Sequence, residues 1–281
     1  MAMDLALDLI QATVQLEQPQ GDGTRTVGTG FLISAPDEAG KPRTVLITAH
    51  HVFQRMPGQT AKIGYRIANK DGSWSYSPQP LKIRDAEGHE LWSHHPIHDV
   101  AAIAIKAPSE FAKAALPEGY LAGDQTFETY KVNTGDEMMA LGFPRGLSSN
   151  TAGFPILRSG RVASYPLAPA KIFPTFLLDF SVFPGNSGGP VFVVGSESNG
   201  APTDGAPNEA LPTSGFIAGL LTQQVELNNE RLEIGIVTHA QYVRETIDLL
   251  NNPHAVETVV AASAADGAKT ASADEATPDR P

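Results

Sequence analysis

Residues suited to nucleophilic chemistry gather in one short stretch of this chain, residues 184–190, PGNSGGP. Its serine, Ser187, stands among three glycines and two prolines, with apolar runs on both sides. Glycine lets the backbone adopt φ > 0 and approach a substrate closely. A serine on such a turn is exposed beside backbone N–H groups, which is what a nucleophile with an oxyanion hole requires. The alternative interpretation is a turn rich in glycine and proline with an incidental serine.

Two further segments contain the residues that would activate such a serine. Residues 44–52, TVLITAHHV, form an apolar, β-branched run that ends in His50 and His51, and residues 98–105, HDVAAIAI, place Asp99 before another apolar run. A strand in each run would deliver these side chains to the edge of a sheet. Neutral imidazole accepts a hydroxyl proton near pH 7, and a buried carboxylate fixes its tautomer. Together the three segments predict acyl transfer by a serine, a histidine and an aspartate.

These segments resemble the motifs of the trypsin/chymotrypsin-like serine peptidases, especially the bacterial members without disulfides. Residues 48–52, TAHHV, resemble the family's Thr-Ala-x-His block, 99–103, DVAAI, its Asp-Ile-Ala-Leu block, and 185–190, GNSGGP, its Gly-Asp-Ser-Gly-Gly-Pro block. The order His, Asp, Ser along the chain is also that of chymotrypsin. The resemblance makes His51 the base and His50 its structural neighbour.

The resemblance also implies a fold, since it extends over roughly residues 10–250. It implies an all-β protein of two packed six-stranded antiparallel β-barrels of the chymotrypsin type, with the active site between them and a C-terminal α-helix. We expect a first lobe at residues 1–110 that carries the histidine and the aspartate. An inter-lobe link and a second lobe that carries the serine follow at 111–238. We expect the helix at 239–252, where apolar residues recur at helical spacing, and a disordered tail at 253–281. The turn residues 70–72 also predict a hairpin, and the polar residues 195–215 predict a long surface loop.

By the same resemblance, roles follow for residues around the nucleophile. Ser187 attacks the scissile carbonyl, with Asp99 orienting His51, and the N–H groups of Gly185 and Ser187 form the oxyanion hole. Thr222 stands where the family has a serine that hydrogen-bonds the catalytic aspartate. The strand that begins at Thr222 would pair with the substrate backbone as an added strand.

The specificity pocket departs from the pattern of trypsin. Ser181 is expected at the base of the pocket, where no carboxylate is then present to hold lysine or arginine. Gly235 would leave the wall of the pocket open, whereas Gln223 and Gln224 stand where the family often has tryptophan and glycine. We expect cleavage after uncharged residues of small or medium size.

Asn186 replaces the aspartate that pairs with a new N-terminus in trypsin-like zymogens. We therefore expect no activation by cleavage of a zymogen.

Other polar residues of the sequence offer alternative assignments. Asp71 or Asp85 could replace Asp99 as the orienting group, but neither stands before an apolar strand. Residues 94–98, HHPIH, suggest a metal cluster by count alone, but a carboxylate–histidine second shell is not evident, so we expect a loop at the rim of the cleft, with no metal or cofactor. Residues 158–161, RSGR, form a small basic spot and are expected at the solvated surface.

Composition limits the partners and the compartment. A formal net charge of −11 and a pI near 5.1 argue against binding nucleic acid or an anionic membrane. The family resemblance implies a protein or peptide substrate. The absence of cysteine fits a reducing cytoplasm, or a bacterial protein in any compartment. Asp4 and Asp8 interrupt the N-terminal apolar stretch, which is unlike a signal peptide. We expect a cytoplasmic protein, or a periplasmic or secreted one if a signal was removed.

The function expected from the sequence is therefore that of a serine endopeptidase. HtrA-like proteases share the lack of cysteine and the asparagine before the serine, but no region resembling a PDZ domain follows the expected helix. The alternative is a latent or catalytically silent trypsin-like fold that acts as a regulated binding or adaptor module.

Overall fold

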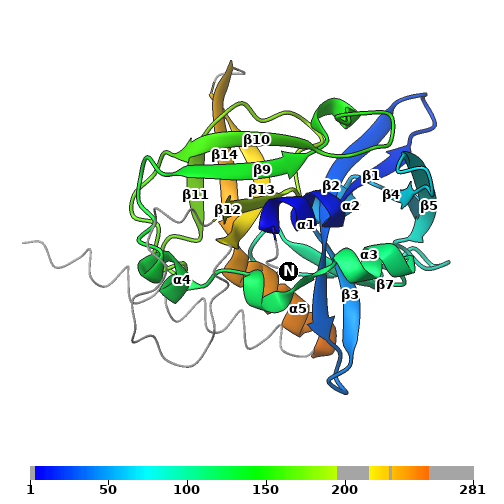
Figure 1. Cartoon of the computed structure of the whole chain (residues 1–281), viewed down its shortest axis with the longest axis horizontal. Helices are drawn as coiled ribbons and strands as arrows, with labels where there is room; N and C mark the ends of the chain where they lie inside the picture. Colours follow the sequence, from blue (N-terminus) through cyan, green and yellow to red (C-terminus); the bar gives the residue numbers. More distant parts are fainter. Residues whose placement is uncertain (1–3, 195–214, 228–229, 253–281) are drawn as a thin grey trace, which may run out of the picture.

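The computed structural model describes residues 4–194, 215–227 and 230–252, which form two β lobes packed against each other (Figure 1). The predicted tail at 253–281, and nearly all of a polar surface loop predicted at 195–215, lie outside these residues. Within the described ranges, no helix is long and apolar enough to cross a membrane.

An eight-stranded sheet forms the first lobe, in the order β5-β4-β1-β2-β3-β7-β6, with β8 parallel to β2. Phe31, Leu32 and Ile33 follow one another in β2 and are all buried, so both faces of the sheet are covered there. The strands are β1 (Thr13–Pro19), β2 (Arg25–Pro36), β3 (Pro42–Thr48), β4 (Thr60–Ala68), β5 (Trp74–Lys82), β6 (Ser93–His94), β7 (Ala101–Ile105) and β8 (Leu116–Pro117).

The second lobe closes into a barrel of six strands in the order β10-β11-β14-β13-β12-β9. Buried aromatic side chains fill it, among them Phe176, Phe192 and Phe216. A closed barrel leaves no exposed sheet edge. The strands are β9 (Glu137–Gly142), β10 (Ile156–Val162), β11 (Thr175–Asp179), β12 (Pro190–Val194), β13 (Gly215–Leu227) and β14 (Glu230–His239).

Short helices connect and cover the two lobes. Helix α1 (Leu5–Ala12) is capped by Asp4, whose carboxylate accepts from the N–H groups of Ala6 and Leu7. This helix packs on β2. The segment predicted as an inter-lobe link contains several more helical turns. The other helices are α2 (His50–Gln54), α3 (Ser109–Ala114), η1 (Glu118–Tyr120), α4 (Asp124–Thr129), η2 (Pro144–Gly146) and α5 (Ala240–Asn251).

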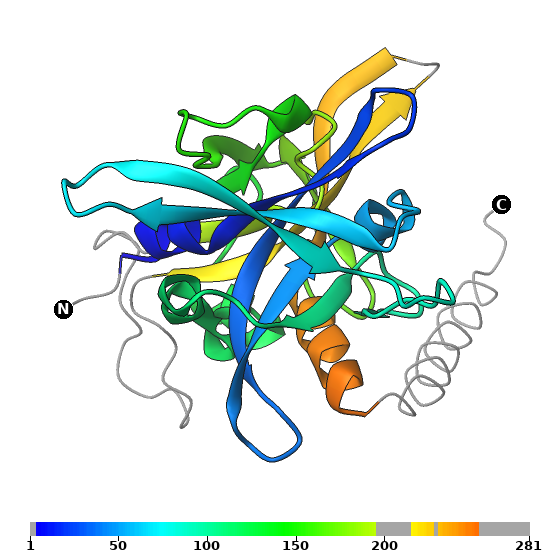
Figure 2. The ribbon, with the colours of Figure 1, turned by 90° about the vertical axis from the view of Figure 1, so that its right-hand side faces the viewer.

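Helix α5 follows the last strand of the barrel but packs largely on the other lobe. It contacts β6 and β7 of the first sheet as well as β13 and β14 of the barrel, and Figure 2 shows it, in orange, to the right of the blue hairpin formed by β2 and β3. Its buried residues include Tyr242, Val243, Ile247 and Leu249 at helical spacing. The helix therefore connects the two lobes.

The predicted all-β, two-lobed architecture with a C-terminal helix is confirmed. The second lobe is a closed six-stranded barrel, whereas the hydrogen-bonded path of the first lobe runs from β5 to β6 without closing among the described residues. The hairpin predicted to turn at residues 70–72 is present as β4 and β5.

Candidate active site

Strand pairing brings His51 and Asp99 together at one end of the first lobe. His51 lies in α2, directly after β3, and Asp99 lies just before β7. Strands β3 and β7 are antiparallel neighbours in which Thr48 faces Ala101, so the end of one strand meets the start of the other. The Nδ1 atom of His51 lies 2.6 Å from Oδ2 of Asp99, and the backbone N–H of His51 donates to Oδ1 at 2.9 Å.

The electrostatics of this pair favour an ionised aspartate. Burial raises the pKa of Asp99, but the hydrogen bonds from the ring and backbone of His51, together with the charge of that ring, outweigh it and leave the pKa below its ordinary value. The ring of His51 can therefore donate from Nδ1 to a carboxylate, which leaves Nε2 available to accept a proton.

Hydrogen bonds to carbonyl groups hold the Ser187 loop. The N–H of Thr29 donates to the carbonyl of Ser187 at 2.9 Å, and its hydroxyl donates to the carbonyl of Gly185 at 2.6 Å. The N–H of Arg145 donates to the carbonyl of Pro184 at 2.6 Å. Among the described residues, the N–H groups of Gly185 and Ser187 have no acceptor, so both remain available to a ligand.

Two positions in this loop require glycine. Gly185 has φ +97 and Gly188 has φ +87, a region that other residues rarely adopt. A Cβ atom on Gly185 would collide with the carbonyl oxygen of Phe143, and one on Gly188 with the carbonyl oxygen of Thr29. Because these obstacles are backbone atoms, they cannot move aside cheaply.

A cavity of about 620 Å³ joins the two halves of the site. Both His51 and Ser187 line it, with Thr222 and Gln223 of β13 along one side. The hydroxyl of Ser187 donates to the carbonyl of Thr222 at 3.1 Å. The backbone of Gln224 lies on the same strand, in register with Gly235, and its side chain is outside the described residues.

Three of the expected contacts differ from the structure. The hydroxyl of Thr222 donates to the carbonyl of Ile236 at 3.2 Å and not to Asp99. Ser181 does not line the cavity, and its carbonyl accepts from the guanidinium of Arg158 at 2.6 Å.

The third difference concerns Gly235, which also lies outside the lining of the cavity. The side chains of Val182, Phe180 and Leu221 lie against the position that a Cβ atom on Gly235 would take. Val182 and Ile236, the residues that follow Ser181 and Gly235, line the cavity in their place.

Sequence reasoning did not identify the apolar residues of the cavity or its two arginines. The alternation of β14 could have indicated Ile236, since neighbouring residues of a strand point to opposite faces. No comparable signal marks the arginines. The lining residues absent from the predictions are Arg55, Val182, Phe183, Pro184, Val225, Arg231 and Ile236.

The histidines beside the cleft do not meet as one group. His50, Glu90 and His94 place potential ligand atoms within 4.8 Å of one another, whereas His95 and His98 are not part of this set. The indole N–H of Trp92 donates to Nδ1 of His50 at 3.1 Å, so the ring proton of neutral His50 resides on Nε2. A histidine that binds a metal normally donates from its second nitrogen, so the arrangement does not fit a metal.

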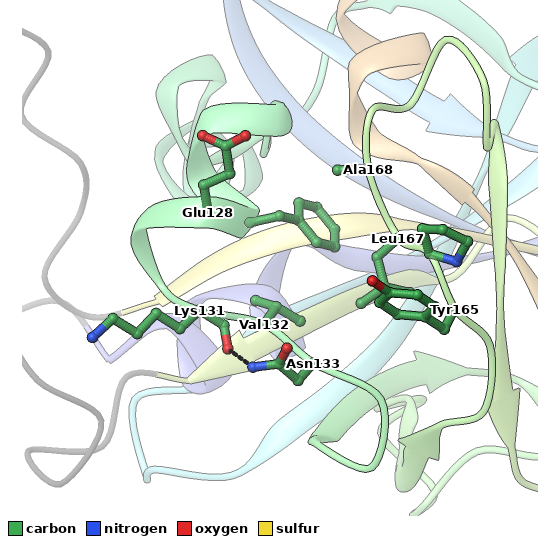
Figure 3. Close-up of a pocket in the computed structure, with 9 residues that line it drawn as sticks. Glu128, Lys131, Val132, Asn133, Tyr165, Leu167 and Ala168 are labelled. Atoms are coloured by element: carbon green, nitrogen blue, oxygen red, sulfur yellow. Dashed lines mark hydrogen bonds between the residues drawn. The ribbon is translucent and has the colours of Figure 1, made fainter.

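A second cavity, of about 430 Å³, lies on the barrel lobe and shares no lining residue with the first (Figure 3). Residues around the end of α4, including Lys131 and Asn133, form one side, and the segment from Tyr165 to Ala168 forms the other. The lining contains no serine, histidine or aspartate, so this cavity offers no second nucleophile and base.

Comparisons with known proteins show the family and the fold. A family model described as "Trypsin-like peptidase domain" matches residues 28–197. A structure of the HtrA-type protease AlgW with tripeptide is 15% identical, with a TM-score of 0.52; the match covers 89% of this chain and 63% of that one. The protease Anisep from Arthrobacter nicotinovorans is also 15% identical, with 85% and 94% covered and a TM-score of 0.49. A search of curated proteins found no match.

The chain thus spans less than two thirds of the length of the AlgW structure. At this level of identity the likeness shows the fold, which here is that of a serine protease with two β lobes.

Proposed function

This chain belongs to the trypsin-like peptidase domain family, and from that premise we propose that it is a serine endopeptidase that acts through a His51–Asp99–Ser187 triad and an acyl-enzyme. The observation that supports this most strongly is the 2.6 Å contact between His51 Nδ1 and Asp99 Oδ2, with His51 and Ser187 lining one cavity. A histidine–aspartate pair with only a structural role would not need to share a cavity with a serine on a turn of glycines at φ > 0.

The proposed reaction uses the three side chains in sequence. Ser187 Oγ attacks the carbonyl carbon of the scissile peptide bond while Nε2 of His51 takes the hydroxyl proton. The same proton then passes to the leaving amine as the peptide C–N bond breaks, which leaves an ester on Ser187. Water then attacks this ester while His51 takes its proton, and Ser187 leaves as the peptide acid is released. Asp99 stabilises the imidazolium of His51 during both acylation and deacylation. The Ser187 hydroxyl, which donates to Thr222 in the free protein, must turn to His51 when substrate binds.

The oxyanion formed in each half-reaction needs donors that are already in place. Gly185 and Ser187 supply these donors, because their N–H groups have no acceptor in the part of the chain that the structure describes, while the neighbouring carbonyls accept from Thr29 and Arg145. Preorganised donors of this kind need no rearrangement as the charge develops.

We also propose that the substrate is a peptide with an uncharged P1 residue of small or medium size. Support comes from the apolar side chains of Val182, Val225 and Ile236 in the cavity. No carboxylate belongs to the described lining, so a basic P1 side chain would lack a counter-charge.

A peptide library of mixed sequence, digested and read by mass spectrometry, tests this proposal. We expect cleavage by the wild type, with alanine, valine, leucine or methionine before the cut, and no cleavage by Ser187→Ala. Ser109→Ala serves as the matched control, since Ser109 is exposed on α3 and lies outside the cavity. Peptides bound without cleavage by a folded wild type would instead support a catalytically silent binding module. Strong preference for arginine, lysine or glutamate would overturn the proposed P1 specificity.

A further inference from the structure

The turn that carries Asp99 is organised around a buried histidine. His95 lies four residues earlier, and its side chain is 1% exposed. Its Nδ1 accepts from the backbone N–H groups of Ile97 at 3.2 Å and His98 at 3.0 Å. Its own backbone N–H donates to the carbonyl of Val100 at 2.9 Å, which closes the turn around Asp99. The position of the Asp99 backbone therefore depends on this ring.

The opposite edge of the same ring is held by the C-terminal helix. Nε2 of His95 lies 3.1 Å from Oε2 of Glu245 on α5, and the side chain of Gln241 donates to Oε1 of Glu245 at 2.9 Å. Because Nδ1 accepts two N–H groups, the ring proton must reside on Nε2 and point at the carboxylate. Burial raises the pKa of Glu245, but the hydrogen bonds from His95 and Gln241 outweigh it and keep the pKa below its ordinary value.

A third contact connects this assembly to the barrel lobe. The ring of Tyr242 packs on His98 at 3.7 Å between centroids and meets His95 edge-on at 5.2 Å. Its hydroxyl donates to the carbonyl of Ala170, which belongs to the second lobe, at 2.8 Å. Helix α5 therefore contacts the Asp99 turn with two side chains that are one helical turn apart.

On the basis of the proposed function, we infer that His95 and Glu245 are positioning residues for Asp99, which makes α5 part of the catalytic assembly. The chain of contacts runs from Glu245 to the ring of His95, from that ring to the turn, and from Asp99 to His51. Neither Glu245 nor His95 lines the cavity, so both residues act on catalysis through Asp99 and not by contact with the substrate.

The test compares two carboxylates of α5. Glu245→Gln keeps the size and one acceptor oxygen but removes the charge that holds the His95 proton. Asp248→Asn is the matched control, since Asp248 is exposed on the same helix and it is Glu245 that hydrogen-bonds His95. We expect Glu245→Gln and His95→Leu to lower kcat roughly 10- to 100-fold with KM little changed, as a small misplacement of a catalytic group does. His95→Gln, which retains an acceptor and a donor, should recover part of the loss.

A second readout reports on the triad without any substrate. The proton between His51 Nδ1 and Asp99 Oδ2 gives a far-downfield ¹H resonance in water. We expect this resonance to shift or broaden in Glu245→Gln and His95→Leu and to stay unchanged in Asp248→Asn, with circular dichroism showing that all three fold.

The outcomes separate the inference from the proposed function. If the wild type hydrolyses peptides and shows the resonance, but Glu245→Gln and His95→Leu match it in both, the positioning role is wrong and the peptidase assignment stands. If the wild type shows the resonance but cleaves nothing, the peptidase proposal fails, and the shift in the variants still decides the positioning role.

Discussion

The two lobes hold their parts of the candidate site by different kinds of contact. In the barrel lobe, the loop of Ser187 is fixed by hydrogen bonds to its own backbone carbonyls and by glycines at φ > 0. In the sheet lobe, His51 and Asp99 are held by side-chain hydrogen bonds, and behind them His95 joins the turn to α5. The nucleophile loop should therefore tolerate almost no added atoms, whereas the acid–base half should respond to changes of charge and tautomer at constant size.

The largest expected effect comes from changing charge without size at Asp99. In Asp99→Asn the amide can no longer hold the Nδ1 proton of His51, so the ring adopts the wrong tautomer and kcat should fall about 10⁴-fold. The control is Asp85→Asn, since Asp85 contacts His89 Nδ1 at 2.9 Å in an exposed turn. Steady-state hydrolysis at pH 7 measures both. An equal loss in the two variants, or none in either, would contradict the assignment of Asp99.

The second-largest loss of activity is expected when a methyl group is added to the loop that carries Ser187. Gly185→Ala places a methyl group against the carbonyl oxygen of Phe143 and displaces one oxyanion donor, so kcat should fall roughly 10²- to 10³-fold. Gly72→Ala is the matched control, since Gly72 has φ +82 but nothing within 4 Å of its Cβ position. If both variants lose activity equally, backbone strain alone and not the donor would explain the result.

The stability of the protein should depend on pH through one buried histidine of the barrel lobe. Burial lowers the pKa of His239 to about 4, and its Nε2 has no hydrogen-bond partner among the described residues. Between its ordinary pKa of 6.5 and about 4, the unfolded chain binds a proton that the folded chain does not, so stability falls as the pH falls. The free energy of unfolding should drop by about 3 kcal/mol from this group across that range.

The measurement is urea unfolding at several pH values for wild type, His239→Gln and His89→Gln. His89 is the control because its side chain is 76% exposed. We expect a smaller slope of stability against pH in His239→Gln alone. An unchanged slope in that variant would show that His239 is not the group responsible.

The smallest effect is a loss of stability, expected where the first lobe contacts the loop of Ser187. The hydroxyl of Thr29 in β2 donates to the carbonyl of Gly185 and accepts from the N–H of Phe143 at 3.1 Å. Thr29→Val leaves both partners buried and unsatisfied, which should cost about 1–3 kcal/mol of stability. Thr60→Val, on an exposed position of β4, should cost much less by thermal unfolding. Comparable losses in both variants would rule out this contact as a special link between the lobes.

Much of the fold and of the candidate site could be predicted from the sequence, because the relevant signals are local. The apolar runs before His51 and after Asp99 indicated two strands, and the structure places these residues in hydrogen-bond contact where those strands pair. The helix at 240–251 followed from the spacing of its apolar residues. Glycines around Ser187 indicated a turn in the positive-φ region, which Gly185 and Gly188 adopt.

The remaining features depend on register and on distant contacts. A shift of one residue exchanges the two faces of a strand, so Gly235 was predicted in the cavity where Ile236 lies. Ser181 and Val182 lie in the loop after β11, where no strand alternation indicates which of the two enters the cavity. His95 and Glu245 meet across 150 positions of the sequence, and no local pattern indicates such a contact.

The most direct test of the proposed triad is labelling with a fluorescent fluorophosphonate, followed by mass mapping of the adduct. Such a probe reacts with a serine that has both an activating base and an oxyanion hole. We predict labelling of the wild type at Ser187, and none in Ser187→Ala or His51→Ala. A folded wild type that stays unlabelled, or an adduct on another residue, would contradict the account.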